Sequence, residues 1–191
     1  GAQVVAPKDE GIIGEVNSIT DFSAIKMMDK AEAVKNGLFN VVGKEIDDAF
    51  VENIKKQAVR PEEVIKAKDM KIVYTPLHGA GNKNVRRVLA EVGFENVYVV
   101  PEQEKPDGTF PTVGYPNPED PKAFTLAIKL AQEKQADIII GTDPDSDRIG
   151  VVVKDNNGNY DILTGNMTGA LLTEYVLGGR KEKGTLPENA A

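Results

Sequence analysis

Between Lys71 and Ile140, short runs of apolar residues alternate with segments in which apolar residues recur every three or four positions. A short apolar run is typical of a buried strand, and the three-to-four spacing is typical of an amphipathic helix. The predicted strands are 71–74, 97–100 and 138–140, and the helices between them lie over 85–92 and 124–131. Strands that alternate with helices indicate a parallel sheet with right-handed crossovers. We therefore predict an α/β protein with three layers, α/β/α, around a mainly parallel sheet.

A different pattern follows the third predicted strand. The apolar-rich segments Ile149–Val153 and Tyr160–Leu163 flank Asn157-Gly158, a dipeptide that strongly favours a β-hairpin. We expect an antiparallel hairpin near the C-terminus, followed by a last helix over residues 166–177.

The N-terminal part is less regular, and residues 1–28 show no clear period. The segment 29–37 predicts a short helix that begins with Asp29 as its N-cap and stops at a glycine. Residues 39–42 predict a short strand, and the apolar positions within 45–58 predict an amphipathic helix.

The two ends indicate a piece of a longer protein, because the sequence begins without an initiator methionine and closes on a polar stretch. We expect residues 1–40 to be a linker or the edge of a preceding domain. Residues 41–164 would form the α/β domain, and residues 165–191 would begin the next domain.

Composition narrows the function classes. Of the 191 residues, 40% are hydrophobic and 28% charged, which is typical of a globular protein. A net charge of −7 argues against nucleic acid or an anionic membrane as the main partner. No apolar run could span a bilayer and no signal-peptide pattern is present, so we expect a cytoplasmic protein. The absence of cysteine excludes disulfides and thiolate metal sites.

The strongest chemical signal is a cluster of carboxylates directly after the predicted strand 138–140. Asp143, Asp145 and Asp147 stand at alternate positions, and alternate side chains of an extended segment share a face. Three carboxylates this close repel one another unless a cation neutralises them. Oxygen ligands suit a hard divalent ion such as Mg2+ or Ca2+. The adjacent Arg148 suits a bidentate contact with an anion such as a phosphate, so the stretch favours phosphoryl chemistry.

Other interpretations of the same aspartates are weaker. An EF-hand loop needs Gly at its sixth position and Glu at its twelfth, where this chain has Arg148 and Lys154. A phosphatase with an aspartyl nucleophile carries two acids near the first strand, whereas here three acids follow a late strand. A solvated acidic turn remains as the alternative without a ligand.

A second candidate region, Thr75–Asn82, leads from the first predicted strand into a helix. Its glycines and the helix N-terminus form a plausible anion site, although a tight turn alone also explains the glycines. Ligands of open parallel sheets bind beyond the carboxyl ends of the strands, so we expect this turn and the aspartates at the same sheet edge. His78, the chain's single histidine, is a candidate general base or a hydrogen-bonded loop residue.

The segment 101–121 is long for a connection in a compact domain. Its prolines stiffen it, and an ordered loop at this edge either borders a site or packs against a neighbouring domain.

Together these stretches resemble the α-D-phosphohexomutase superfamily of phosphoglucomutases and phosphomannomutases, in particular bacterial α-phosphoglucomutases. The resemblance covers roughly residues 40–177. It rests on four segments in the family's order, of which the last, the metal-binding loop, is the most specific: 75–79 (TPLHG), 107–111 (DGTFP), 116–119 (PNPE) and 141–150 (GTDPDSDRIG).

The resemblance implies the second of four domains in a Mg2+-dependent enzyme that interconverts hexose 1-phosphate and hexose 6-phosphate through a phosphoserine and a hexose bisphosphate. Asp143, Asp145 and Asp147 would bind Mg2+, and Arg148, His78 and Gly79 would lie near the phosphoryl group. The family's phosphoserine loop, sugar-selecting loop and phosphate-binding loop do not occur in this sequence. We therefore assign no catalytic residue to it and expect it to be inactive without the other domains of the polypeptide. The alternatives are a non-catalytic Mg2+-binding scaffold and a Mg2+-dependent phosphatase.

Overall fold

The computed structural model describes residues 3–190, so the outermost residues of the first and last predicted segments lie outside the described part. The chain divides into two compact units, with the division between Gly43 and Lys44. The predicted boundary after residue 40 lies close to this division. That the residues from 165 onward begin a further domain stays a prediction.

The first unit contains the helix α1 (Lys8–Ser18), the 3-10 helix η1 (Phe22–Ala24) and the helix α2 (Lys30–Lys35). The predicted helix after Asp29 is confirmed, because the Asp29 carboxylate accepts the N–H groups of Ala31 and Glu32. The sequence pattern missed α1, and none of that helix's residues is buried. The predicted strand 39–42 is wrong. These residues pair with no other strand, and a single extended segment with exposed side chains has no ladder to join.

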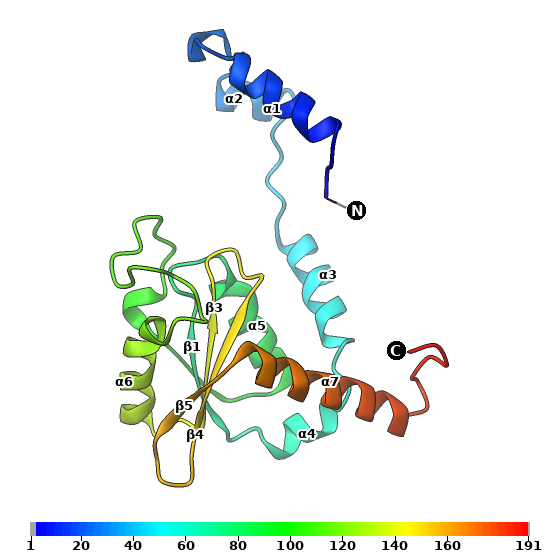
Figure 1. Cartoon of the computed structure of the whole chain (residues 1–191), viewed down its shortest axis with the longest axis vertical. Coiled ribbons are helices and arrows are strands. Elements are labelled where there is room, and N and C mark those ends of the chain that lie inside the picture. Colours follow the sequence, from blue (N-terminus) through cyan, green and yellow to red (C-terminus); the bar gives the residue numbers. More distant parts are fainter. Residues whose placement is uncertain (1–2, 191) are drawn as a thin grey trace. The chain divides into compact units, whose positions relative to one another are not determined.

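The second unit is built on one five-stranded sheet (Figure 1). Its strands are β1 (Lys71–Thr75), β2 (Asn96–Val99), β3 (Ile138–Thr142), β4 (Ile149–Lys154) and β5 (Tyr160–Leu163). They lie in the order β2-β1-β3-β4-β5. β1 pairs in parallel with β2 and β3, and the hairpin β4–β5 adds antiparallel to β3. The predicted parallel core and the C-terminal hairpin are both confirmed, and the whole sheet is mixed.

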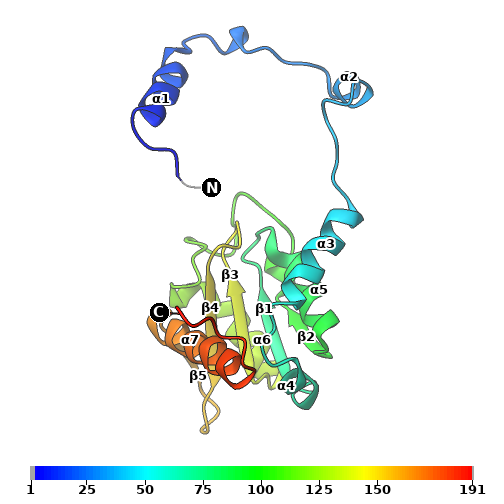
Figure 2. The ribbon, with the colours of Figure 1, turned by 90° about the vertical axis from the view of Figure 1, so that its right-hand side faces the viewer.

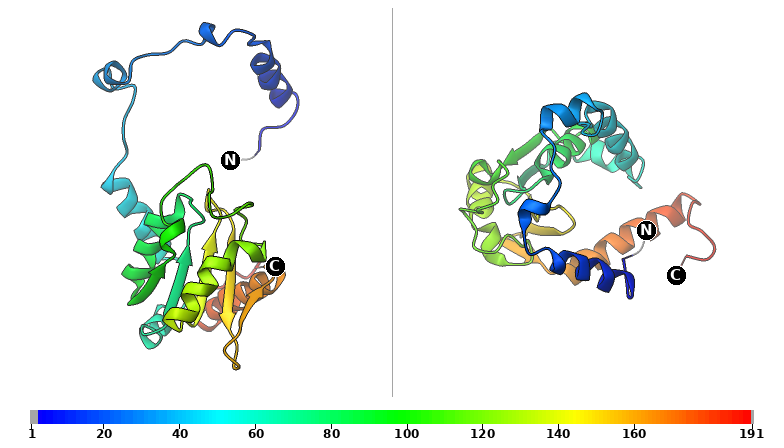
Figure 3. Two further views of the ribbon diagram at one scale, coloured as in Figure 1. Left: turned by 90° about the vertical axis from the view of Figure 1, so that its left-hand side faces the viewer. Right: turned by 90° about the horizontal axis from the view of Figure 1, so that it is seen from above.

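Helices cover both faces of this sheet and make the three layers. The helix α6 (Thr125–Lys134), entered through the 3-10 helix η3 (Pro121–Phe124), covers one face. The helices α3 (Lys44–Lys55), α5 (Gly81–Val92) and α7 (Gly165–Glu182) lie on the other side (Figure 3). Alternate residues of a strand face opposite layers. Val73 and Ile139 accordingly join Phe124 and Val152 in the core beneath α6.

The helix ends match the prediction in one case and differ from it in others. α5 stops at Gly93, whose φ of 119° is left-handed. Glycine adopts this conformation without the steric cost that a Cβ would bring. α3 ends at Lys55, three residues before the predicted end. α7 runs to Glu182, beyond the predicted end at 177. The short helix α4 (Pro61–Lys66), which begins on a proline at its first position, was not predicted.

α7 contacts the residue that directly precedes α4, and Figure 2 shows the two helices near each other. The backbone N–H of Arg60 donates to the Tyr175 hydroxyl at 3.0 Å, and the Arg60 guanidinium pairs with Glu182 at 2.9 Å. Across residues 3–190, we find no helix that combines the length and the apolar character needed to cross a membrane.

Candidate metal centre

Two loops meet at the carboxyl edge of the parallel strands, as predicted. One is the turn from β1 into α5, and the other joins β3 to β4 and carries the three aspartates. The backbone N–H of Ala80 donates to the carbonyl of Pro144 at 2.8 Å. A Cβ on Gly79 would lie 2.6 Å from that same carbonyl oxygen. The β1–α5 turn therefore presses directly on the aspartate loop.

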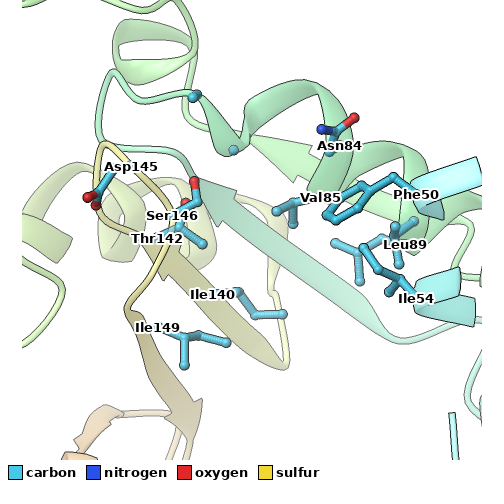
Figure 4. Close-up of a pocket in the computed structure, with 13 residues that line it drawn as sticks. Phe50, Ile54, Asn84, Val85, Leu89, Ile140, Thr142, Asp145, Ser146 and Ile149 are labelled. Carbon is cyan, nitrogen blue, oxygen red and sulfur yellow. The ribbon is translucent and has the colours of Figure 1, made fainter. Parts of the chain in front are cut away.

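The three aspartates converge at this point. One carboxylate oxygen from each of Asp143, Asp145 and Asp147 lies within 4.8 Å of the others. Asp143 is buried at 8% exposure, whereas the other two side chains are exposed. Figure 4 shows Asp145 and Ser146 beyond Thr142, at the end of β3.

The loop's backbone corrects one step of the sequence argument. Extended chain was expected to place alternate carboxylates on one face, but residues 143–146 form a turn in which the Ser146 N–H donates to the Asp143 carbonyl at 3.1 Å. Ser146 adopts a left-handed φ of 63°. The carboxylates therefore converge because the chain folds back on itself, not because a strand alternates.

The pKa values of two of the aspartates shift in opposite directions. Burial raises the pKa of Asp143, but hydrogen bonds from the Arg148 N–H and from the two neighbouring aspartates outweigh it and leave that pKa below its usual value. The pKa of Asp147 is raised, chiefly by its hydrogen bond with Asp143 and then by the negative charges of Asp145 and Asp143. Without a cation, the cluster therefore retains a proton more readily than separate carboxylates would.

Arg148, at the end of the aspartate loop, contacts two of the three carboxylates. Its backbone N–H donates to Asp143 Oδ1 at 3.0 Å. Its Nε lies 3.9 Å from oxygens of both Asp143 and Asp147, and half of its side chain stays exposed. The guanidinium therefore borders the carboxylates and is open to an anion that approaches from solvent.

His78 approaches the site with its backbone and turns its ring elsewhere. The imidazole is 5% exposed. Its Nδ1 lies 3.2 Å from the Lys105 carbonyl, and its Nε2 lies 2.8 Å from the Thr112 hydroxyl. The part of the turn that touches the aspartate loop is Gly79 and Ala80.

The long segment 101–121 packs against the β1–α5 turn. Leu77 forms a small apolar cluster with Val113 and Ala123, against which Phe110 packs. Sequence reasoning missed two polar residues of this packing, the buried Gln103 and the exposed Thr112. Single threonines and glutamines in a loop carry no periodic signal, so only the three-dimensional contacts reveal them.

The donor set fits a hard divalent cation. It consists of three carboxylates with no nitrogen or sulfur donor among them, which favours Mg2+, Ca2+ or Mn2+ over Zn2+ or Cu2+.

The fold and this loop define a class, an α/β/α domain with a carboxylate cluster beyond a parallel strand. Residues 48–158 match the family model for phosphoglucomutase/phosphomannomutase, alpha/beta/alpha domain II. The chain belongs to this family. Its similarity extends across most of its length to a probable phosphomannomutase of Haemophilus influenzae, with 38% identity over 92% of this chain and 34% of the relative.

Two further comparisons broaden this result. Human phosphopentomutase is 33% identical over 96% of this chain and 30% of its own length. A crystal structure of a phosphoglucomutase/phosphomannomutase family protein from Burkholderia thailandensis superposes with a TM-score of 0.51 at 21% identity, over 78% of this chain and 30% of that one, and supports the fold. The chain spans about a third of the length of the curated relatives it matches.

Proposed function

We propose that this chain is the cation-binding domain of a longer phosphohexomutase, which interconverts hexose 1-phosphate and hexose 6-phosphate with glucose as the first candidate sugar. The observation that carries the proposal is the convergence of Asp143, Asp145 and Asp147 at a strand end, within a domain of the phosphoglucomutase/phosphomannomutase family.

Under this proposal the three aspartates hold Mg2+, which when bound withdraws charge from the transferring phosphoryl group. Arg148, exposed beside the carboxylates, receives phosphate oxygens of the substrate. His78 and Gly79 support the loop from the β1–α5 turn. The nucleophile is a phosphoserine supplied by another domain of the same polypeptide.

The proposed partners are the hexose phosphate, the hexose bisphosphate intermediate and the remaining domains. The net charge of −7 disfavours nucleic acid and anionic membranes. A cytoplasmic location follows from the proposed substrates, which are phosphorylated sugars.

The test compares this chain with the longer protein from which it comes. We expect the longer protein to convert glucose 1-phosphate with Mg2+, and this chain alone to show no conversion. Mannose 1-phosphate and ribose 1-phosphate serve as parallel substrates, because relatives are named for mannose and pentose phosphates. Robust mutase activity from the chain alone would sink the division of labour proposed here, and release of inorganic phosphate would favour a phosphatase.

A matched pair of variants isolates the aspartate loop. In the longer protein, Asp145→Asn removes a charge from the cluster, and we expect activity to fall by at least a hundredfold at limiting Mg2+. Asp161→Asn removes a charge from an exposed position on β5 and should leave activity unchanged. Near-normal activity of Asp145→Asn at low Mg2+ would show that the aspartates are a solvated turn.

A further inference from the structure

His78 lies at the centre of the contacts between the β1–α5 turn and the segment 103–112. Its backbone N–H donates to the Gln103 carbonyl at 3.0 Å, and its carbonyl accepts the Asp107 N–H at 3.1 Å. Its ring adds the contacts with Lys105 and Thr112. The segment therefore contacts all four polar groups of this residue, which are its backbone N–H, its carbonyl and its two ring nitrogens.

We propose that His78 is a positioning residue, held as the Nδ1–H tautomer by a relay of hydrogen bonds, that anchors the segment 103–112 and through it steadies the aspartate loop. This role differs from that of a general base, because both ring nitrogens are already engaged within the protein.

The relay begins beneath the turn and has one consistent direction. The Leu77 N–H donates to the Thr75 hydroxyl, which leaves that hydroxyl's own proton for Gln103 Oε1 at 2.6 Å. With its oxygen so occupied, Gln103 donates through Nε2 to the Thr112 hydroxyl at 3.1 Å. Thr75 and Gln103 are at most 1% exposed, so solvent offers them no alternative partner.

The direction of the relay determines the histidine tautomer. Thr112 already accepts from Gln103, and its proton is free to donate to His78 Nε2. The Lys105 carbonyl can only accept, so His78 Nδ1 must carry the proton. An Nε2–H tautomer would leave Nδ1 of the buried His78 facing a carbonyl oxygen without a proton between them.

The β1–α5 turn connects His78 to the aspartate loop, so restraint of His78 also restrains that loop. His78 precedes Gly79 and Ala80, which contact Pro144. His78 itself has a left-handed φ of 62°, and Leu77 before it has one of 47°. Two successive non-glycine residues in this region store strain unless their surroundings hold them there. The relay supplies that restraint, so its loss should release the turn and with it the loop that carries Asp143 and Asp145.

The first experiment reads the tautomer directly, because the chain has a single histidine. Long-range 1H–15N correlation spectra of the 15N-labelled chain at pH 8 should show a protonated Nδ1 and an unprotonated Nε2. An Nε2–H pattern, or the averaged pattern of a free imidazole, overturns the relay.

The second experiment tests the anchor with isosteric variants. Thr112→Val removes the hydroxyl that His78 contacts, and we expect backbone amides of 103–112 to exchange about tenfold faster in hydrogen-exchange measurements. Thr109→Val removes a hydroxyl of the same segment that donates to Asp107 and not to His78, and it should leave exchange at Asp107 N and Gln103 N unchanged. Equal behaviour of the two variants overturns the anchor.

The third experiment carries the effect to the aspartate loop, and it alone rests on the proposed cation site. Mg2+ is titrated into the chain while amide signals of residues 143–148 are followed. We expect His78→Leu to weaken Mg2+ binding several-fold. His78→Asn keeps a donor near the Nδ1 position and tolerates the left-handed φ, and should recover most of that loss. Unchanged binding in His78→Leu overturns the positioning role. If the unaltered chain shows no response to Mg2+, the cation site fails, while the tautomer and exchange results still decide the anchor.

Discussion

Gly79 lies directly against Pro144, and no side chain fits between them. A Cβ on Gly79 would lie 2.6 Å from the Pro144 carbonyl oxygen and 2.8 Å from its carbonyl carbon. Backbone atoms cannot swing aside as the end of a flexible side chain can. The two loops can therefore lie this close only because residue 79 has no side-chain carbon.

The first prediction follows from this contact. Gly79→Ala should push the aspartate loop away from the β1–α5 turn and cost about 1–3 kcal/mol of unfolding free energy, as overpacked sites do. Since the displaced loop carries Asp143 and Asp145, Mg2+ binding should weaken as well. Urea denaturation and a Mg2+ titration by calorimetry measure the two effects.

Gly108→Ala is the matched control, because nothing lies within 4 Å of a Cβ at Gly108 and its φ is not left-handed. We expect it to leave both stability and Mg2+ binding close to those of the unaltered chain. Equal losses in the two variants would contradict the proposed contact.

The second prediction concerns pH. The pKa of Asp147 is raised, first by its hydrogen bond with Asp143 and then by neighbouring negative charge. A carboxyl group whose pKa is higher in the folded state stabilises the fold below its unfolded pKa, and that contribution is lost as pH rises through the folded pKa. At neutral pH without a cation, the charge on Asp147 therefore opposes folding.

Asp147→Asn should accordingly raise the thermal midpoint of the metal-free chain at pH 7. The gain should shrink as pH falls through the raised folded pKa of Asp147, and it should be gone below about pH 4, the usual range of an aspartate, where the carboxyl is protonated in both states. Mg2+ should stabilise the unaltered chain more than the variant. Thermal melts at both pH values, with and without Mg2+, check this. A variant that is less stable than the unaltered chain at pH 7 without Mg2+ would show that the cluster is not under repulsive strain.

The third prediction concerns the buried pair beneath α5. The hydroxyls of Tyr74 and Thr142 lie 2.9 Å apart, and burial raises the pKa of Tyr74. Tyr74→Phe or Thr142→Val leaves the other hydroxyl without its partner, so each should cost about 1–3 kcal/mol. The double variant should cost less than the sum, because no orphaned group remains. Strict additivity in urea denaturation would show that the hydroxyls do not interact.

The elements that the sequence predicted well are those whose burial is repeated along the chain. β1 and β3 are continuous apolar runs because helices cover both faces of the sheet. The end of α5 could be predicted because a single residue type, glycine, suits the left-handed backbone at Gly93. Residues 39–42 share the composition of a strand but have no neighbouring strand, and pairing is not encoded in a four-residue pattern.

The candidate site was predictable in its residues and less so in its geometry. Charge repulsion identified the aspartates, whereas the turn at Ser146 that brings them together depends on a left-handed backbone at a residue that is not glycine. The relay through Gln103 and Thr112 left no trace in the sequence, because its members are scattered in a loop and each is common on protein surfaces.

The last prediction concerns how α7 is held. A Cβ on Gly179 would lie 2.5 Å from the Val59 side chain and 3.3 Å from Arg60 Nε. The close approach lets Arg60 reach both Tyr175 and Glu182. Gly179→Ala should therefore separate α7 from Val59 and Arg60 and cost about 1–3 kcal/mol despite the better helix propensity of alanine.

Gly169 lies in the same helix with nothing within 4 Å of a Cβ, so Gly169→Ala should stabilise the chain by about 0.5–1 kcal/mol. The two substitutions are chemically identical and differ only in what surrounds them, so urea denaturation should give effects of opposite sign. If Gly179→Ala also stabilises the chain, α7 is not held by the contact with Val59. The bond from the Arg60 N–H to the Tyr175 hydroxyl would then have to hold the helix alone, and Tyr175→Phe should release it, which faster amide exchange along α7 would reveal.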